Sequence, residues 1–193
     1  ILYGAIPSIF AFPSHKVSED IYHETLGKLL ETCHTPWLVT NNLIEEKINN
    51  FNGVTKTIIG YQAYKSYDAK DASGVYRTDP DAISILQHSS GTTGLKKGVA
   101  LSNRSIIAQI ENYSQSICLT QDDVIVSWLP LYHDMGLIAC LLMPLLTGTQ
   151  VVLIAPFDWV IRPIMLFEQI TRYRATLCWL PNFCYPFMAA KVR

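Results

Sequence analysis

The chain has 193 residues, 49% of them hydrophobic, and a formal net charge of −1 from 15 basic and 16 acidic residues. This is the size of one large domain or a part of one, with enough apolar material for a core. The balanced charge gives no support for nucleic acid or an acidic macromolecule as the main ligand. Since no Cys-x-x-Cys pair is present, we expect reduced core thiols of a cytoplasmic protein. The five cysteines are Cys33, Cys118, Cys140, Cys178 and Cys184.

The sequence gives no sign of a membrane span or a signal peptide. The longest apolar run, residues 136–146, is shorter than the roughly 20 residues of a spanning helix and contains Pro144, so a buried helix is expected there. The first residues lack the basic segment and cleavage site of a signal peptide. Because the chain opens on Ile1 and stops just after an apolar helical pattern, we expect a piece of a longer protein.

In the first 80 residues, apolar runs predict three short strands, at residues 5–12, 37–40 and 57–59. The first is expected to be buried. Ser18 is the expected N-cap of a helix with acidic residues in its first turn. The apolar face of that helix is formed by Ile21, Leu26, Leu29 and Leu30. A second helix is expected over residues 42–51, and a polar surface connection over residues 61–79.

Further along, strands are expected at residues 83–88, 124–127, 150–155 and 175–180. Helices are expected between them: one capped by Ser102, a buried one ending near Gly148, one over residues 162–173, and one opened by Pro181. The apolar face of the helix after Ser102 is formed by Ile106, Ile107, Ile110, Tyr113 and Ile117. Apolar strands that alternate with helices predict an α/β fold with mainly parallel sheets and helices on both faces.

Residues 89–99 combine three glycines, four hydroxyl side chains and two lysines between two apolar segments. Glycines allow close approach of backbone N–H groups to a ligand, and this density of donors suits the oxygens of a polyphosphate. The spacing matches neither a Walker loop nor a dinucleotide fingerprint. It therefore predicts a phosphate loop of a third kind, with a plain turn between two strands as the alternative.

Tyr132-His133-Asp134 is the only place where a histidine and a carboxylate meet at the end of an expected strand. The alternative is a helix-capping aspartate beside a structural histidine. Because the carboxyl ends of parallel strands share one edge of a sheet, the glycine loop, this turn and the turn at residues 181–183 are expected to line one crevice.

The run Leu-Pro-Leu-Tyr-His-Asp-Met-Gly-Leu at residues 129–137, taken with the glycine loop, resembles the adenylate-forming superfamily. That superfamily includes acyl-CoA synthetases, peptide-synthetase adenylation domains and luciferases. Together with Leu-Pro-Asn-Phe-Cys-Tyr at residues 180–185, the wording is most similar to the fatty acyl-AMP ligase branch. The resemblance implies that residues 1–193 are a fragment of a single AMP-binding N-terminal domain, without the C-terminal domain.

The resemblance further implies an enzyme that uses ATP and Mg²⁺ to convert a fatty acid or another carboxylic acid into an acyl-adenylate, with release of pyrophosphate. The acyl group would then pass to the thiol of an acyl carrier protein or of coenzyme A. The fragment alone is expected to be inactive. Two alternatives stay open: a non-catalytic phosphate- or nucleotide-binding module, and a nucleotide hydrolase with Asp134 as the water-positioning acid.

The resemblance also implies roles for single residues. The phosphate contacts would be Ser89, Ser90, Gly91, Thr92, Thr93, Gly94 and Lys97. Thr92 and Thr93 would lie near magnesium, and Lys97 would neutralise the departing pyrophosphate. His133 would orient the carboxylate or steady charge on the adenylate.

Two further residues, Phe183 and Tyr185, would lie beside the acyl chain, or else be plain core aromatics. One departure from the family pattern is Lys96, which stands where the family usually has proline. Since proline would stiffen the loop, a more mobile loop is expected.

Overall fold

The computed structural model describes residues 4–11, 18–35, 37–40, 56–59, 79–89 and 97–192. For residues 56–59, 89 and 97 it describes the backbone alone. The chain forms two compact units, Phe12–Val75 and Ile1–Ala11 with Tyr76–Arg193. The helix expected over residues 42–51 and nearly all of the connection expected over residues 61–79 lie outside the described residues. No helix among those described is long and apolar enough to cross a membrane.

The smaller unit contains helix α1 (Glu19–Thr32) and the parallel strands β1 (Trp37–Thr40) and β2 (Lys56–Ile59). As predicted, Ser18 caps α1, and its hydroxyl accepts a hydrogen bond from the Ile21 N–H at 3.4 Å. Leu26 and Leu30 are buried, but the Ile21 side chain is 58% exposed. Ile21 was wrongly included in the apolar face. It stands five positions before Leu26, which places it well to the side of the stripe that Leu26 and Leu30 form.

The larger unit begins with the antiparallel pair β3 (Ile83–Ser89) and β4 (Lys97–Ser102), which confirms the strand expected before the glycine loop. Before it, Ser8 makes a single parallel bridge to Leu86, whose N–H donates to the Pro7 carbonyl at 3.0 Å. Residues 4–8 are exposed. The buried strand expected over residues 5–12 is therefore wrong: the apolar run lies along a sheet edge.

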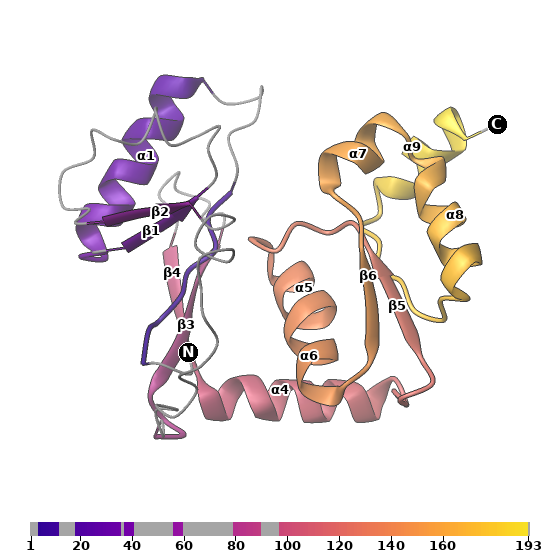
Figure 1. Cartoon of the computed structure of the whole chain (residues 1–193), viewed down its shortest axis with the longest axis horizontal. Helices are drawn as coiled ribbons and strands as arrows, with labels where there is room; N and C mark the ends of the chain where they lie inside the picture. Colours follow the sequence, from indigo (N-terminus) through magenta and orange to yellow (C-terminus); the bar gives the residue numbers. More distant parts are fainter. Residues whose placement is uncertain are drawn as a thin grey trace. The chain divides into compact units, whose positions relative to one another are not determined.

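Helix α4 (Asn103–Ser116) follows directly and is capped as predicted, since the Ser102 hydroxyl accepts from the Ser105 N–H at 3.1 Å. Ile106 and Ile110 are buried, whereas Ile107 is 48% exposed and was wrongly assigned to the buried face. Figure 1 shows β4 ending at one end of α4 and β5 (Val124–Ser127) beginning near the other. Because β3 is antiparallel to β4, both β3 and β5 run away from α4.

The buried helix expected before Gly148 is α5 (Asp134–Leu137), a π-helical turn η1 (Ile138–Leu142) and α6 (Met143–Thr147) in succession. The π turn comes just before Pro144, which has no N–H to donate to the carbonyl one turn earlier. Gly148 ends the segment with φ of +74°, a left-handed conformation that favours glycine. Burial is incomplete, because Leu145 and Leu146 are exposed at the far end.

Strand β6 (Gln150–Leu153) pairs in parallel with β5, as the alternation of strands and helices predicts. Helix α7 (Pro156–Ile161), which the sequence analysis missed, comes next and is followed by α8 (Ile164–Tyr173) and, later, α9 (Cys184–Lys191). The strand expected over residues 175–180 is wrong: only Leu177 bridges to β5, opposite Ile125. At the start of β5, the Val124 N–H donates to the Thr176 hydroxyl at 3.1 Å and not to a backbone carbonyl.

Two neighbouring residues of β5 show that this sheet is covered on both faces. Ile125 and Val126 are both fully buried, but they belong to different core clusters. Ile125 packs with buried residues of α4 and of the α5–α6 segment. Val126 packs with Trp159 of α7 and Leu166 of α8. Two of the three strand pairs among the described residues are parallel, which confirms the predicted α/β class, and the β3–β4 hairpin is the antiparallel part.

Candidate active site

The candidate site begins where β5 ends. Ser127, the last residue of β5, is fully buried, and its hydroxyl accepts the Leu129 N–H at 3.1 Å. Its carbonyl accepts the Ile154 N–H at 2.8 Å, which fastens the end of β5 to the segment after β6. The chain then turns, and the His133 N–H donates to the Pro130 carbonyl at 3.0 Å. The turn that carries His133 thus starts from a buried support in which the hydroxyl and the carbonyl of Ser127 are both hydrogen-bonded.

Gly136 lets this turn lie against the first turn of α5. A Cβ atom at Gly136 would lie 2.3 Å from the carbonyl oxygen of Pro130 and 3.1 Å from that of Leu129. Cβ contacts below 3.0 Å essentially do not occur in proteins. The close approach of the two backbone segments therefore requires glycine at this position.

The His133 side chain is 65% exposed, and its Nδ1 lies 2.6 Å from Oδ1 of Asp134. The same carboxylate oxygen accepts the Met135 N–H at 2.7 Å. Asp134 is the first residue of α5 and His133 its N-cap without a side-chain cap, so the alternative of a capping aspartate is wrong. Because Nδ1 faces the carboxylate, Nε2 of this exposed side chain is left for a ligand. A neutral imidazole has one N–H donor and one acceptor, so only the ring protonated on both nitrogens can keep its contact with Asp134 and also donate to an anionic reactant.

Aromatic side chains bring the turn at residues 181–183 to the end of β5. Trp128 stacks on Trp159 with ring centroids 3.8 Å apart and planes at 3°. Phe183 meets Trp128 edge to face at 6.2 Å between centroids. Phe183 and Tyr185 are 59% and 60% exposed. They are therefore not core aromatics of this chain, and Phe183 presents an apolar surface beside Trp128, directly after β5.

The glycine loop connects β3 to β4, and Ser89 and Lys97 are the last register pair of the hairpin below it. Ser90, Gly91, Thr92, Thr93 and Gly94 lie outside the described residues, as do the side chains of Ser89 and Lys97. Ile85 of β3 and Ile125 of β5 pack in the same core cluster, and both strands run away from α4 (Figure 1). The loop and the His133 turn thus both follow strand ends that point away from α4. That the expected phosphate contacts of the loop lie near His133 remains a prediction.

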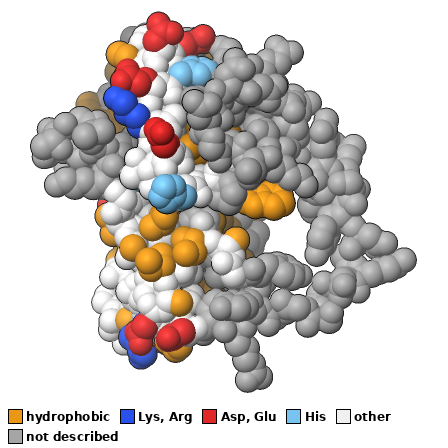
Figure 2. Space-filling model, turned by 90° about the vertical axis from the view of Figure 1, so that its left-hand side faces the viewer, with side chains coloured by type: hydrophobic (Ala, Val, Ile, Leu, Met, Phe, Trp, Pro, Cys, Tyr) orange, Lys and Arg blue, Asp and Glu red, His pale blue; other side chains and the backbone are white. Residues whose placement is uncertain are grey.

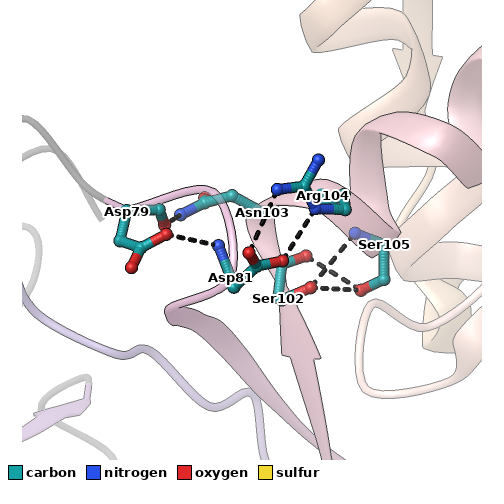
Figure 3. Close-up of polar contacts among 6 residues, drawn as sticks. All are labelled: Asp79, Asp81, Ser102, Asn103, Arg104 and Ser105. Carbon is teal, nitrogen blue, oxygen red and sulfur yellow. Dashed lines mark hydrogen bonds and ion pairs between the residues drawn. The ribbon is translucent and has the colours of Figure 1, made fainter.

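A polar network ties the base of the hairpin to α4, at the end opposite the glycine loop (Figure 3). Arg104 pairs with both carboxylate oxygens of Asp81, with Nε to Oδ1 at 2.7 Å and Nη2 to Oδ2 at 3.0 Å. The hydrogen bond from Arg104 holds the pKa of the Asp81 carboxyl below its usual range. Asn103 donates to the Asp79 carbonyl at 3.3 Å, and Asp79 accepts the Asp81 N–H at 2.9 Å.

On the face drawn in Figure 2, red side chains gather near the top with blue below them, and a smaller group of red and blue side chains lies together at the bottom. Among the described residues, no three His, Cys, Asp or Glu side chains lie together to hold a metal ion.

The cysteines divide into two groups. Cys33 and Cys118 are exposed, so their assignment to the core was wrong, whereas Cys140 and Cys184 are buried and Cys178 is half-buried. All five are free thiols. Burial, together with the nearby thiols of Cys140 and Cys184, raises the pKa of Cys178 to about 11. The Cys178 thiol is therefore protonated and unreactive at neutral pH.

The fold and the site can now be compared with known proteins. Residues 15–191 match the family model described as AMP-binding enzyme, and the chain belongs to this family. The structure is similar to a fatty acyl-adenylate ligase from L. pneumophila solved with acyl adenylate and pyrophosphate, with a TM-score of 0.84 and 26% identity, over 100% of this chain and 33% of that one.

Curated relatives agree with this family. The chain is 32% identical over 150 residues to the medium-chain-fatty-acid–[acyl-carrier-protein] ligase TtuA of Teredinibacter turnerae, a match to 78% of this chain and 22% of that protein. It is 34% identical over 105 residues to the ligase of the same description, JamA, of Moorena producens, a match to 54% of this chain and 18% of that protein. The chain therefore spans about a fifth of the length of these relatives.

Proposed function

We propose that the chain is part of an enzyme that uses ATP to activate a fatty acid, or another carboxylic acid, as an acyl-adenylate. The observation that carries this proposal is the His133–Asp134 pair, held at the end of β5 by buried groups and exposed to a ligand. The names of the relatives support it, since TtuA and JamA are ligases of medium-chain fatty acids. So does the solved relative that holds acyl adenylate together with pyrophosphate.

In the proposed reaction a carboxylate oxygen attacks the α-phosphorus of ATP, and the bond from that phosphorus to the bridging oxygen of pyrophosphate breaks. Both reactants are anions, so the site must align them and screen their charge. We assign His133 to the carboxylate and the α-phosphate. Ser89, Ser90, Gly91, Thr92, Thr93, Gly94 and Lys97 are the proposed contacts of the departing pyrophosphate. Mg²⁺ bound with ATP would supply further positive charge, with Thr92 beside it.

The acyl group would then pass to a thiol. We propose acyl carrier protein or coenzyme A as the acceptor, in the cytoplasm; the printed descriptions of TtuA and JamA support the carrier protein. Phe183 and Tyr185 are the proposed contacts of the acyl chain, because both rings are exposed and exposed aromatic rings can bury hydrocarbon. Trp128 would hold Phe183 in place from below.

The proposal is tested by ATP–pyrophosphate exchange with a panel of fatty acids, measured on the full-length enzyme. Wild-type protein should exchange with at least one acid, and His133→Ala should lower the rate by roughly 10²-fold or more, as loss of one donor to a developing charge does elsewhere. Asp134→Asn should cost less, because Asp134 would act on the reactants only through the ring of His133. His34→Asn is the matched control: this exposed histidine has a φ of +47°, which asparagine tolerates, and the exchange rate should not change.

The proposal would be refuted if the wild-type enzyme showed no ATP–pyrophosphate exchange with any carboxylic acid of the panel. Titration of the 193-residue chain with Mg-ATP then separates the alternatives. Micromolar binding without any exchange by the full-length enzyme would favour a nucleotide-binding module. Phosphate release that continues at full rate in His133→Ala would favour a hydrolase.

A further inference from the structure

We propose that Gly136 is a positioning residue for His133, an inference that rests on the proposed adenylation. Gly136 has no side chain with which to touch a ligand. Its missing Cβ is what allows the Pro130 carbonyl to lie on the first turn of α5, where a Cβ atom would be 2.3 Å from the oxygen and 2.9 Å from the carbon of that carbonyl.

The Pro130 carbonyl also holds His133. It accepts the His133 N–H at 3.0 Å, and the His133 carbonyl in turn accepts the Leu137 N–H at 2.8 Å. The oxygen that meets Gly136 is therefore the oxygen that fixes the backbone of His133. Any displacement of this carbonyl is passed to His133 through a single hydrogen bond.

Burial decides which side would move if a methyl group were added. On the helix side, Leu137, Cys140 and Met143 are at most 3% exposed and packed in the two core clusters. On the turn side, Leu129 is buried and Pro130 is half-buried, whereas Tyr132 and His133 are exposed, so the turn is packed where it starts and open where it carries the histidine. Because a packed core resists displacement more than an exposed turn does, the turn would yield. The added methyl group would push residues 130–133, and His133 with them, outward.

The size of the shift sets the expected effect. Ordinary contact distance requires the carbonyl to retreat by about 1 Å, and a misplacement of that size at a catalytic group costs on the order of 10²-fold in rate. The loss should fall on kcat more than on the KM for ATP, since the proposed triphosphate contacts lie in the glycine loop and not on this turn. A general loss of folded enzyme would also lower the apparent kcat without changing KM, but that loss would persist in a His133→Ala background, so a double-mutant cycle separates the two causes.

The test is a double-mutant cycle in the full-length enzyme, with ATP–pyrophosphate exchange as the readout. Wild type, Gly136→Ala, His133→Ala and the double variant are compared. Gly136→Ala should lose on the order of 10²-fold in the wild-type background but less than about 3-fold in the His133→Ala background, because the two changes act through one side chain.

Gly148→Ala is the matched control, since it adds the same methyl group at the other end of the α5–α6 segment. Its φ of +74° makes alanine strained there, but no atom lies within 4 Å of the added Cβ. Gly148→Ala should lower the melting temperature and leave the exchange rate unchanged. A stability loss in this segment is thereby separated from a displacement of His133.

Several results would overturn the inference. Gly136→Ala with a rate within about 3-fold of wild type would do so, and so would losses that multiply in the double variant. The inference would also be overturned if Gly136→Ala melted more than about 10 °C below Gly148→Ala. The buried helix, and not the turn, would then have moved to relieve the clash. If the wild-type enzyme showed no exchange with any acid, the proposed function would be refuted, and this inference with it.

Discussion

Two buried serine hydroxyls of the larger unit differ in one respect, the presence of a hydrogen-bond partner. The Ser127 hydroxyl accepts the Leu129 N–H and also hydrogen-bonds with Cys140. The Ser114 hydroxyl, on α4, is buried and has no partner among the described residues. Replacement of each serine by alanine should therefore change the free energy of unfolding in opposite directions.

The magnitudes follow from what each change leaves behind. Ser127→Ala leaves the N–H of Leu129, a residue that is 7% exposed, without its acceptor. An unsatisfied buried donor costs about 1–3 kcal/mol, so a loss of about 2 kcal/mol is expected. Ser114→Ala removes a polar atom that has no partner and places a better helix former in α4. It should stabilise the protein by up to about 1 kcal/mol.

Equilibrium urea unfolding of the wild type and both variants measures these differences. The midpoint should shift while the m-value stays constant. In thermal unfolding, Ser127→Ala should melt about 4–8 °C lower and Ser114→Ala about 1–4 °C higher than wild type. Equal destabilisation by both changes would refute the reasoning, since it would show that loss of packing, and not hydrogen bonding, controls both sites. A Ser127→Ala variant as stable as wild type would refute it too.

Three further predictions concern the support of β5 and the thiols. Ile125→Ala should cost about 2–5 kcal/mol in urea unfolding, because the side chain is fully buried. Hydrogen bonds from Thr176 and Thr120 hold the pKa of Asp123 below its usual range in the folded protein. The Asp123 carboxylate therefore stabilises the fold above the unfolded-state pKa of about 3.9, and this stabilisation is lost as the pH falls through the folded-state pKa. Asp123→Asn should thus lose less stability than wild type between pH 7 and pH 3 in urea titrations. With a thiol reagent at pH 7 and mass spectrometry, Cys33 and Cys118 should be labelled in the folded protein and Cys178 only after unfolding.

Much of the fold could be predicted, because local signals and long-range packing agree. Ser18 and Ser102 cap their helices as the sequence indicates. The misses are cases in which an apolar run shows burial but not pairing. Residues 175–180 read as a strand, yet the Thr176 hydroxyl replaces one backbone acceptor of the ladder. Helix α7 was missed although Pro156, at its first position, is a known helix-start signal.

The candidate site was predicted in part. His133 and Asp134 lie where a parallel strand ends, which the alternation of strands and helices indicates. The role of Gly136 could not be predicted, because it comes from the approach of the Pro130 carbonyl, and the sequence does not state distances between backbone segments. The one signal was a glycine inside a helical pattern, which often marks close packing. The stack of Trp128 on Trp159 likewise needs the fold.

His133 itself is exposed, but the turn that carries it starts at the fully buried Ser127. This separation predicts how activity and stability respond to change. Substitution of His133 should reduce exchange with little effect on unfolding, because an exposed side chain contributes little to stability. Substitution of Ser127, which is fully buried and starts the turn, should reduce both, because the end of β5 and the turn share its hydroxyl as an anchor. A His133→Ala variant as unstable as Ser127→Ala would contradict this division, since it would place the histidine among the structural supports of the turn.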